Sequence, residues 1–538
     1  MKSNQTIETQ SKCIALYPGA FRPPHAAHLT AVLALVARPE VDEVVVIISN
    51  RCRTIPGTTQ ALDPNVALRI WSLYLRGMKK VKVEIAPHSS VKQALGYFKR
   101  VKKGDRLLFC IGEKDYEGGD ARFKDIEVLA KQASVSATLI PAPTGAITIR
   151  GTDLRTMMAQ GDAGRASFIK ALPKALSAAQ REGVWTVCRD GMKEISEIVQ
   201  EKIRSILAKK EMGEISEISS AREGKLDPVF RVCFKDGRRY FVKYAGDTVA
   251  SESWGERLSL KPKRRLSTER RTLNRLRENG VNEAVLPEVV LFDKETLTLV
   301  LTEVCPGGQS LSAYLKKEIF DPIVARQAGR FLAKCHRLPS PIAPVWGDTE
   351  SDRRHWKKML ILRTEGINSA DLSEQVRNDL KGLKRVSEQA CEQTTGNRLL
   401  ILDYTPKNIL VYQRKIGVID FELSSSIGDP AYDLGLFLGH YVLSGLIAAS
   451  DSSAQSAIFE ALDAYRRNVG QAWPEMRGRV VSFTGAAMLS LLMGDRPKEL
   501  HIYKRDLFYK AAQLLSAGLG QSVDIDSILS STLAGRWA

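Results

Sequence analysis

Residues 13–150 alternate short apolar runs with helical patterns, and this alternation restricts the fold more than any other feature of the chain. The apolar runs are CIALYPG, VDEVVVIIS, VKVEIAP, DRLLFCIG and VSATLIPAP. Segments with helical spacing separate them, such as HLTAVLALVA and NVALRIWSLYLRG. Strands that alternate with helices form parallel sheets, so we predict a doubly wound α/β domain over residues 1–188. Ligands of such domains bind beyond the carboxyl ends of the strands.

The pattern changes in the second half of the chain. Residues 189–214 include GMKEISEIVQEKIRSILAKK, an amphipathic pattern that we interpret as a connecting helix, and the polar KKEMGEISEISSAREG follows as a boundary. Two segments then each predict a pair of strands with a tight turn, PVFRVCFKDGRRYFVKYAG and LPEVVLFDKETLTLVLTEV. The sequence is largely helical from Ser310 onward. We therefore predict a second domain over residues 215–538, with a small β-rich lobe before a larger helical lobe.

Composition narrows the function classes. The chain carries 79 Lys and Arg against 61 Asp and Glu, a net charge of +18, which favours anionic partners such as nucleotides, phosphorylated metabolites, nucleic acid or an acidic membrane surface. Its eight cysteines occur singly, without a CxxC pair, which indicates reduced thiols. No apolar run approaches the roughly 18 residues of a membrane span, and the polar N-terminus does not resemble a signal peptide. We expect a cytoplasmic protein without a membrane span.

A pair of histidines follows the first apolar run. In YPGAFRPPHAAHLTAV, a glycine turn and two prolines precede His25 and His28, which open a helical pattern. The start of a helix presents unpaired N–H groups and a positive dipole end, and side chains three residues apart lie on one face. The two imidazoles can therefore donate hydrogen bonds to a phosphoryl group bound there. A pair of purely structural histidines is the alternative for this motif alone.

A second motif ends the same domain. In ITIRGTDLRTMMAQGD, a short loop with Gly151 and Thr152 leads into a helical pattern that carries Asp153 and Arg155 in its first turn. The loop N–H groups and the Thr152 hydroxyl can hold phosphates, and Arg155 provides a planar fork for a leaving pyrophosphate.

These two motifs resemble those of the HxGH nucleotidyltransferase superfamily, which has a Rossmann-like fold, a GxFxxxHxGH start and an ISxTxxR finish. The matching residues are Gly19, Phe21, His25, His28, Ile149, Thr152 and Arg155. Ala27 and Arg150 depart from the pattern, where the superfamily has glycine and serine. The resemblance implies that Gly19, Phe21 and Thr152 bind the nucleotide. It also implies that a substrate phosphate attacks the α-phosphate of a nucleoside triphosphate, with His25, His28, Arg155 and Mg²⁺ stabilising the charge.

A charged segment follows the predicted strand at residues 106–111. In IGEKDYEGGDARFKD, Lys114, Asp115 and Arg122 stand at the edge of the sheet where substrates bind. They either contact the substrate or belong to a solvated loop, and we favour the loop because charged loop residues are common.

The second half carries its own set of polar motifs. In LILDYTPKNILVYQRKIGVIDFE, Asp403 and Asn408 lie on a loop before an apolar strand, and Asp420 ends the next strand. Asp403 is suited to take the proton of an acceptor hydroxyl, whereas Asn408 and Asp420 are suited to hold Mg²⁺. Upstream, Lys243 lies in a predicted strand and Glu269 in a predicted helix, and such a pair can fix the phosphates of ATP.

Residues 215–538 resemble the aminoglycoside phosphotransferase and choline kinase family, whose domains have a two-lobed, protein-kinase-like α+β fold. The resemblance is carried by the segments DYTPKNILV, VIDFE, GDPAYDLG and AKCHRLP. It implies that Glu303, in TEVCPGG, lies at the nucleotide-binding hinge between the lobes. The family writes HGD at the catalytic loop, whereas Ile401 and Leu402 precede the aspartate here. The phosphate-covering loop is weakly marked, with Gly224 as its one glycine in SSAREGKLDPVF.

We therefore predict a bifunctional enzyme. A kinase makes a phosphomonoester, and a nucleotidyltransferase couples a phosphomonoester to a nucleoside triphosphate with release of pyrophosphate, adenylyl transfer being favoured over cytidylyl transfer. The expected cofactors are Mg²⁺ and ATP, with CTP left open for the first domain. The expected partners are a nucleoside triphosphate and a small phosphorylated or hydroxylated metabolite.

Two alternatives remain open. The kinase-like domain is catalytically weak and acts as a nucleotide sensor or regulator, which the altered HGD motivates. Alternatively, the nucleotidyl acceptor is a nucleic acid end, which the net charge motivates. The basic segment RLSLKPKRRLSTERRTLNRLREN lacks interleaved aromatic residues, so we favour a solvated helix face over a nucleic-acid groove.

Overall fold

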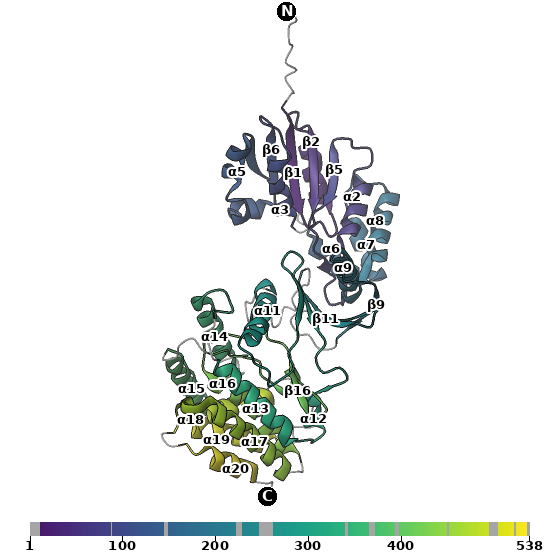
Figure 1. Ribbon diagram of the computed structural model, residues 1–538. Coiled ribbons are helices and arrows are strands. Elements are labelled where there is room, and N and C mark those ends of the chain that lie inside the picture. Colours follow the sequence, from purple (N-terminus) through teal and green to yellow (C-terminus); the bar gives the residue numbers. More distant parts are fainter. Residues whose placement is uncertain are drawn as a thin grey trace, which may run out of the picture. The chain divides into compact units, whose positions relative to one another are not determined.

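A computed structural model describes most of the protein (Figure 1). The described residues are 11–87, 89–144, 149–221, 229–246, 262–338, 343–364, 372–392, 398–448, 451–493, 504–520 and 523–534. The chain divides into two compact units, which we describe separately. The first comprises Met1–Glu214 and Gly246–Ser251, and the second comprises Ile215–Ala245 and Glu252–Ala538.

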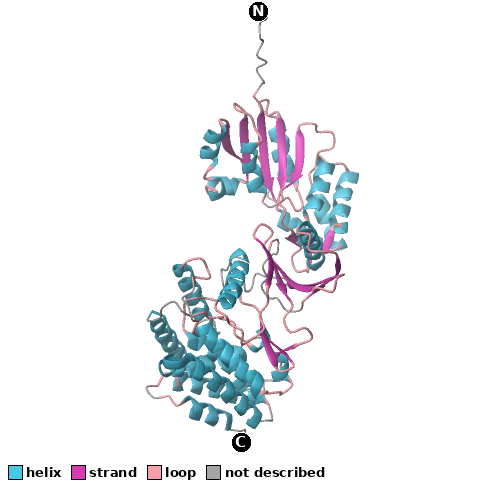
Figure 2. Ribbon diagram, viewed as in Figure 1, coloured by secondary structure: helices cyan, strands magenta, loops and turns pink. Residues whose placement is uncertain are grey.

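The first unit is built on a parallel sheet of five strands (Figure 2). The five apolar runs form its strands, which are β1 (Cys13–Gly19), β2 (Glu43–Ile48), β5 (Val81–Ile85), β6 (Arg106–Ile111) and β7 (Ser136–Pro141). Their spatial order is β5-β2-β1-β6-β7. The chain moves outward from β1 to β5 and then crosses to β6 on the other side of β1. The carboxyl ends of β1 and β6 therefore flank the switch point at which such sheets bind ligands.

Both faces of this sheet are covered. Along β1, Ala15 and Tyr17 belong to one apolar core and Leu16 belongs to another, because successive side chains of a strand point to opposite faces. Burial on both faces explains why the strands are nearly continuous apolar runs. The helices of the unit are α1 (Ala26–Val36), α2 (Pro64–Tyr74), α3 (Ser90–Leu95), α4 (Glu113–Glu117), α5 (Ile126–Ala133), α6 (Gly151–Ala159), α7 (Asp162–Lys170), α8 (Ala178–Asp190) and α9 (Ile195–Lys209), with 3₁₀ turns at Gly96–Lys99 and Ala121–Phe123.

The segment that we interpreted as a connecting helix packs within the first unit. A small antiparallel sheet joins β3 (Arg53–Thr54), β4 (Gln60–Leu62) and β8 (Met192–Glu194). α9 follows β8 directly, and its Ile198 packs against Cys52 and Ala61. The start of α9 thus packs against the small antiparallel sheet of the first unit.

The second unit begins with an antiparallel sheet of five strands, ordered β12-β13-β11-β10-β9. These strands are β9 (Ile215–Ser220), β10 (Val229–Phe234), β11 (Arg239–Tyr244), β12 (Val289–Asp293) and β13 (Thr298–Thr302), and α11 (Pro262–Glu278) lies between β11 and β12 in the chain. The two predicted strand pairs are present. The polar boundary stretch is in part a strand, β9, at the edge of the sheet. Its polar sequence suits an edge strand, since Ile218 is the one buried residue of the six and three of the others are exposed.

Among the described residues, the remaining regular structure of the second unit is helical, apart from one small sheet of β14 (Gln309–Ser310), β15 (Ile409–Tyr412) and β16 (Lys415–Val418). The helices are α12 (Leu311–Lys316), α13 (Pro322–His336), α14 (Thr349–Thr364), α15 (Glu374–Glu392), α16 (Pro430–Ile447), α17 (Asp451–Val469), α18 (Trp473–Met493), α19 (Lys504–Ala517) and α20 (Ile525–Ala534), with 3₁₀ turns at Pro406–Asn408 and Gly470–Ala472. α13 and α17 cross closely, because a Cβ on Gly329 would lie 2.1 Å from the carbonyl oxygen of Ala461. A small β-rich lobe followed by a larger helical lobe matches the predicted order.

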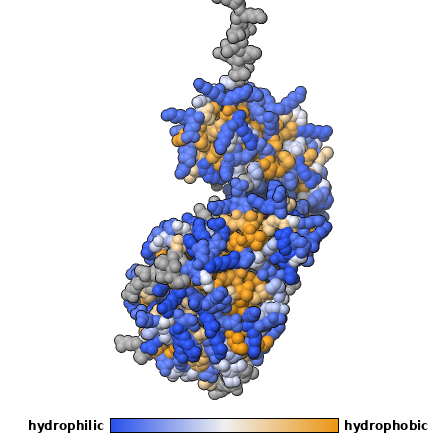
Figure 3. All heavy atoms as spheres, viewed as in Figure 1, coloured by the Kyte–Doolittle hydropathy of each residue, from blue (hydrophilic) through white to orange (hydrophobic). Residues whose placement is uncertain are grey.

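Hydrophilic side chains cover much of the face drawn in Figure 3, as expected for a strongly charged chain, and an apolar strip crosses the second unit. Among the described helices, none is both long and apolar enough to cross a bilayer. All eight cysteines are free thiols, and five of them are buried.

Candidate functional sites

The first candidate site lies where β1 ends and α1 begins. His25 caps α1 in an extended conformation, with φ −133° and ψ −179°, and His28 lies in the first turn. The Tyr74 hydroxyl of α2 donates to the carbonyl of Pro24 at 3.0 Å, which anchors the residue before the cap. The histidine pair therefore stands at a helix N-terminus beside the switch point of the parallel sheet, where an anion is favoured.

Gly19 and Phe21 shape the loop that precedes the histidines. A Cβ on Gly19 would lie 2.4 Å from the Phe21 ring, so only glycine allows the ring to cover this turn. Phe21 has a left-handed backbone, with φ 52°. Its ring meets that of His28 edge-on, with the centroids 4.9 Å apart, and that of Trp71 at 5.6 Å. In the structure these residues position His28, and their contact with a nucleotide stays a prediction.

The two imidazoles are stacked, with ring centroids 3.6 Å apart and planes at 28°. The backbone N–H of His25 donates to Nδ1 of His28 at 3.3 Å, so His28 in its neutral form carries its proton on Nε2. Burial lowers the pKa of His25 to about 4, and burial together with His25 holds the pKa of His28 well below its ordinary value. The Nδ1 atom of His25 is buried and has no partner among the described residues. At pH 7 the pair provides hydrogen bonds rather than positive charge.

Arg155 supplies the charge that the histidines lack. Its guanidinium donates to the carbonyls of Arg22 at 2.7 Å and Thr54 at 2.9 Å, and to the Thr152 hydroxyl at 3.1 Å. Burial and the nearby Arg53 lower the pKa of Arg155, but neutral partners alone fix its orientation. Gly151 allows the close approach, since a Cβ there would lie 3.3 Å from the Arg22 carbonyl. The structure thus brings both ends of the first domain's motif pair together.

Two arginines near this site were not predicted. Arg22 is 2% exposed, and its guanidinium donates to the carbonyl of Ser49. Arg53 is half-buried in β3, where burial and Arg51 lower its pKa. Arg22 occupies a variable position inside the first motif, and Arg53 lies outside both motifs, so each meets Arg155 only when separate loops fold together. No sequence signal marked them.

The charged segment after β6 pairs with itself. Arg122 lies 2.6 Å from Asp120 and 3.4 Å from Asp115, and its side chain is exposed. The side chain of Lys114 lies outside the part of the chain that the structure describes. These exposed ion pairs fit the interpretation as a solvated loop.

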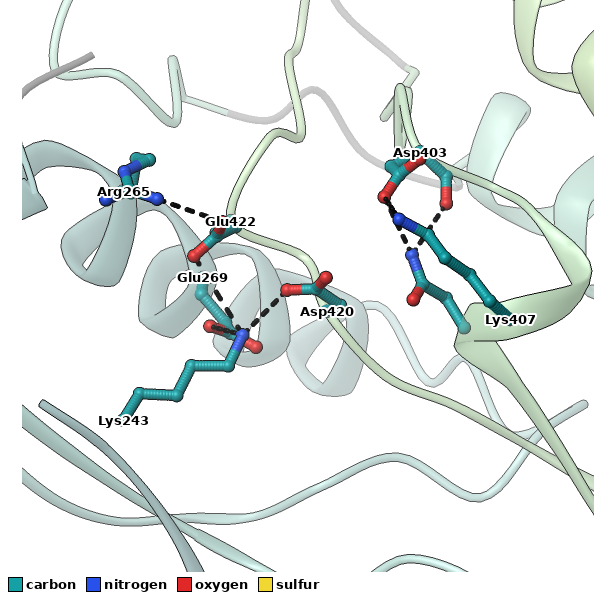
Figure 4. Close-up of polar contacts among 8 residues, drawn as sticks. Lys243, Arg265, Glu269, Asp403, Lys407, Asp420 and Glu422 are labelled. Atoms are coloured by element: carbon teal, nitrogen blue, oxygen red, sulfur yellow. Dashed lines mark hydrogen bonds and ion pairs between the residues drawn. The ribbon is translucent and has the colours of Figure 1, made fainter. Parts of the chain in front are cut away.

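The second candidate site is centred on Lys243 of β11 (Figure 4). Its Nζ donates to Glu269 Oε2 of α11 and to Asp420 Oδ1, both at 2.7 Å. Burial opposes the charge of Lys243, but Asp420, Glu269 and Glu422 outweigh it and hold its pKa well above the ordinary value. The Lys243–Glu269 pair that the sequence order suggests therefore forms.

Glu422 completes this cluster and was not predicted as a site residue, although it ends the quoted segment VIDFE. Its carboxylate lies 3.3 Å from Arg265 and 4.0 Å from Lys243. Carboxylate oxygens of Glu269, Asp420 and Glu422 lie within 4.8 Å of one another. Asp420 has a left-handed backbone, with φ 68°, which turns its side chain toward Lys243. Three oxygen donors so close together match the ligands that Mg²⁺ prefers.

Asp403 lies opposite this cluster, on the loop before β15 (Figure 4). Its Oδ2 accepts from Asn408 Nδ2 at 2.9 Å and pairs with Lys407 Nζ at 2.9 Å. Asn408 also donates to the Asp403 carbonyl at 3.0 Å, which closes the loop on itself. The amide nitrogen of Asn408 thus orients Asp403, and its amide oxygen is the atom left for a cation. Asp403 and Asn408 are brought together as predicted, whereas Lys407 was not singled out.

The loop is braced from below although it lacks the histidine of HGD. The N–H groups of Ile401 and Leu402 donate to the Asp433 carboxylate at 2.7 and 2.8 Å. Asp433 is fully buried and also contacts His336 Nε2 at 3.1 Å. Leu402 has φ 60°, the region in which glycine is favoured, and glycine is what the resembled family has there. A buried carboxylate therefore holds a backbone conformation that the sequence does not favour locally.

Glu303, expected at the hinge, follows β13 and already has two partners. Its carboxylate pairs with Arg231 and with Arg239, the latter at 3.1 Å. These ion pairs join the residue to the antiparallel sheet, and a nucleotide contact by Glu303 stays a prediction. Gly224, expected in the phosphate-covering loop, lies outside the described residues.

Comparison with known proteins identifies the type of the second unit. Residues 217–478 match the model of the phosphotransferase enzyme family, of the aminoglycoside phosphotransferase type. No curated protein matches the sequence significantly. The second unit therefore contains a phosphotransferase domain of this type, as the sequence predicts.

Several solved structures are similar to the chain at low identity. A choline kinase from Streptococcus pneumoniae is 16% identical over 60% of this chain and 99% of its own, with a TM-score of 0.36. A choline/ethanolamine kinase family protein from Mesorhizobium loti is 18% identical over 62% of this chain and 99% of its own, with a TM-score of 0.37. A macrolide 2′-phosphotransferase from Brachybacterium faecium is 16% identical over 60% and 99%, with a TM-score of 0.34. We base the assignment of the domain on the family match.

Proposed function

We propose that the chain is a bifunctional enzyme, in which the second unit phosphorylates a small hydroxylated molecule and the first unit transfers a nucleotidyl group to a phosphomonoester. The observation that carries the proposal is the geometry of two separate sites. One combines a base, a phosphate-binding lysine and a carboxylate cluster, and the other combines paired imidazoles with an arginine at a helix N-terminus.

In the kinase reaction, Asp403 accepts the proton of the acceptor hydroxyl. The acceptor oxygen forms a bond to the γ-phosphorus of ATP as the bond from that phosphorus to the bridging oxygen of ADP breaks. Lys243, fixed by Glu269, binds the phosphates. Asp420, Glu422 and Asn408 are suited to hold Mg²⁺, which neutralises phosphate charge when bound. The brace from Asp433 keeps Asp403 in place, which supports turnover despite the altered HGD.

In the nucleotidyl transfer, an oxygen of the substrate phosphate bonds to the α-phosphorus, and the bond to the pyrophosphate oxygen breaks. His25 and His28 donate hydrogen bonds to the phosphoryl oxygens as charge develops on them. Arg155, together with Arg22 and Arg53, supplies positive charge for the triphosphate. No covalent intermediate is needed, because positioning and charge stabilisation are sufficient. ATP is the favoured triphosphate, with CTP as the alternative.

The test uses the full chain with Mg²⁺, ATP or CTP, and two panels of acceptors, one of alcohols and one of phosphomonoesters. ADP and pyrophosphate are measured separately. We expect ADP from at least one alcohol and pyrophosphate from at least one phosphomonoester. ADP without pyrophosphate in every combination removes the nucleotidyltransferase half, and pyrophosphate without ADP removes the kinase half.

A second candidate for the second unit is a nucleotide-binding regulatory domain. Ile401 and Leu402 in place of the HGD residues favour it. It predicts that ATP binds tightly in equilibrium dialysis while no alcohol is phosphorylated. It also predicts that ATP changes the rate of pyrophosphate release when CTP is the nucleotidyl donor, and that Lys243→Met abolishes this change.

A further inference from the structure

Arg363 lies in the last turn of α14, close to the loop that carries Asp403. Its Nε donates to the Tyr432 hydroxyl at 3.2 Å, and its Nη1 donates to the Ser490 hydroxyl at 3.3 Å. Tyr432 directly precedes Asp433, which binds the backbone immediately before Asp403. Burial opposes the charge of Arg363, but Tyr432 and Asp403 outweigh burial and raise its pKa. The guanidinium is thus within electrostatic reach of the proposed catalytic base.

Among the described residues, the hydrogen-bond partners of Arg363 are neutral. Within the described residues, no carboxylate lies at ion-pair distance from it, and its two contacts are hydroxyls. The neighbouring carboxylates are already occupied: Asp403 pairs with Lys407 at 2.9 Å, and Asp433 accepts the backbone N–H groups. Two cations, Arg363 and Lys407, therefore share the single negative charge of Asp403 at this end of the site.

A half-buried guanidinium without an ion-pair partner is costly, because burial removes water from a charge that its two hydroxyl partners and the more distant Asp403 offset only in part. Guanidinium presents five donors in a planar fork, and two of them are used here. The remaining donors fit the two oxygens of a carboxylate or of a phosphate group. A cationic ligand would instead be repelled by Arg363 and Lys407 together.

We propose that the acceptor of the phosphotransferase is a hydroxylated anion, whose carboxylate or phosphate group binds Arg363 while its hydroxyl lies at Asp403. The inference rests on the proposed kinase function of this site. According to this proposal, the domain accepts hydroxylated acids and phosphate esters in preference to neutral alcohols and amino alcohols.

The experiment compares acceptors that differ only in charge, using the full chain with MgATP and measuring ADP. The matched pairs are pantothenate with panthenol, ribose 5-phosphate with ribose, and glycerol 3-phosphate with glycerol, and choline, ethanolamine and kanamycin form a cationic set. We expect kcat/KM for the anionic member to exceed that of its neutral partner by at least about 10-fold in one or more pairs. The cationic set should give no ADP above the rate without acceptor.

Variants at Arg363 then assign the preference. Arg363→Gln should lower kcat/KM for the anionic acceptor by roughly 10- to 100-fold, mainly through KM, because a charged hydrogen-bonding partner is lost. Arg363→Lys, which keeps the charge but not the fork, should recover part of that loss. Lys358→Gln removes an exposed positive charge from the same helix and should change kcat/KM by less than about 2-fold. Equal urea midpoints for the three variants show that folding is not the cause.

The possible failures are distinct. Transfer to neutral or cationic acceptors in preference to the anionic ones overturns the inference and leaves the kinase function standing. An anionic preference that Arg363→Gln does not reduce overturns the role of Arg363 as the anchor. No transfer to any acceptor removes the proposed kinase function, and the inference with it.

Discussion

The two candidate sites of this protein treat charge in opposite ways. At the start of α1, buried neutral histidines stand with arginines, and no carboxylate pairs with Arg155 among the described residues. Around Lys243, three carboxylates gather within 4.8 Å of one another, and cations neutralise them. The first arrangement favours an anion. Under the proposed kinase function, the second suits a phosphate chain together with a metal ion, and the separate carboxylate of Asp403 is its proton acceptor.

Under the proposed function, the two units carry out phosphate chemistry with two different kinds of site. Where the attacking group is itself a phosphate, it is already ionised at neutral pH, and the protein needs no base. Where the attacking group is a hydroxyl, a base has to be placed beside it. Among the described residues of the first unit, no carboxylate pairs with Arg155, and the nearby Asp153 accepts the backbone N–H of Arg150 at 2.8 Å, whereas Asp403 stands in the second unit.

The largest expected effect comes from removing Asp403, the proposed base of the second site. Asp403→Asn should reduce ADP formation by about 10³-fold or more, because an amide cannot accept the hydroxyl proton. Pyrophosphate release should stay within about 2-fold of the wild-type rate, since the first unit does not use Asp403. The matched control is Asp506→Asn, the same change at an exposed position of α19. Loss of pyrophosphate release in the Asp403 variant would show that the two sites are not independent.

The reverse variant tests the first site. His28→Asn should lower pyrophosphate release by roughly 10²- to 10³-fold, because a hydrogen bond to the developing phosphoryl charge is lost. ADP formation should be unchanged, and a parallel assay on the same preparation measures it. Unaltered pyrophosphate release would mean that the stacked histidines are only part of the packing around Phe21.

The brace beneath the catalytic loop gives the next prediction. In Asp433→Asn, one of the N–H groups of Ile401 and Leu402 faces an amide NH₂ in place of an acceptor oxygen. We expect the free energy of unfolding to fall by about 3 kcal/mol, as for other buried charged hydrogen bonds that lose a partner. Urea unfolding followed by tryptophan fluorescence measures it, with Asp526→Asn as a control at a surface ion pair. A loss below about 0.5 kcal/mol contradicts the brace.

The smallest expected effect is a response to acid in the first unit. His25 has a pKa of about 4 when folded and an ordinary value of 6.5, so between these values the unfolded chain binds a proton that the native site does not. This contribution to stability is complete above pH 6.5 and decreases as the pH falls. At pH 5 the free energy of unfolding should therefore be lower by about 2 kcal/mol than at neutral pH. Lys243, with a raised pKa, behaves in the opposite way and loses its contribution in strong alkali.

Hydrogen exchange of α1 in the full chain, corrected for intrinsic rates, measures the acid effect. Protection at pH 5 should be lower than at pH 7 in the wild type, and His25→Gln should reduce the difference. An identical pH dependence in the variant would assign the effect to other groups.

The sequence predicted the fold best where burial imposes a regular pattern of apolar residues. The parallel strands were visible because burial on both faces makes them continuous apolar runs, and the Lys243, Glu269, Asp403, Asn408 and Asp420 set was visible because its order and spacing follow one chemistry. β9 was missed because an edge strand tolerates polar residues, so its polar sequence was interpreted as a domain boundary. Arg22, Arg53 and Arg363 were missed because each meets its site through tertiary contacts with distant residues. No local pattern records such an approach.

The close crossing of α13 and α17 affects how the proposed phosphotransferase site responds to raised temperature. The same two helices that touch at Gly329 and Ala461 also join His336 to the Tyr465 hydroxyl at 2.7 Å. His336 contacts Asp433, and Asp433 holds the backbone before Asp403. A chain of three side chains, Tyr465, His336 and Asp433, thus links the packing of the two helices to the position of Asp403, the proposed proton acceptor. We expect loosening of this helix pair to silence phosphoryl transfer at temperatures at which the antiparallel sheet is still intact.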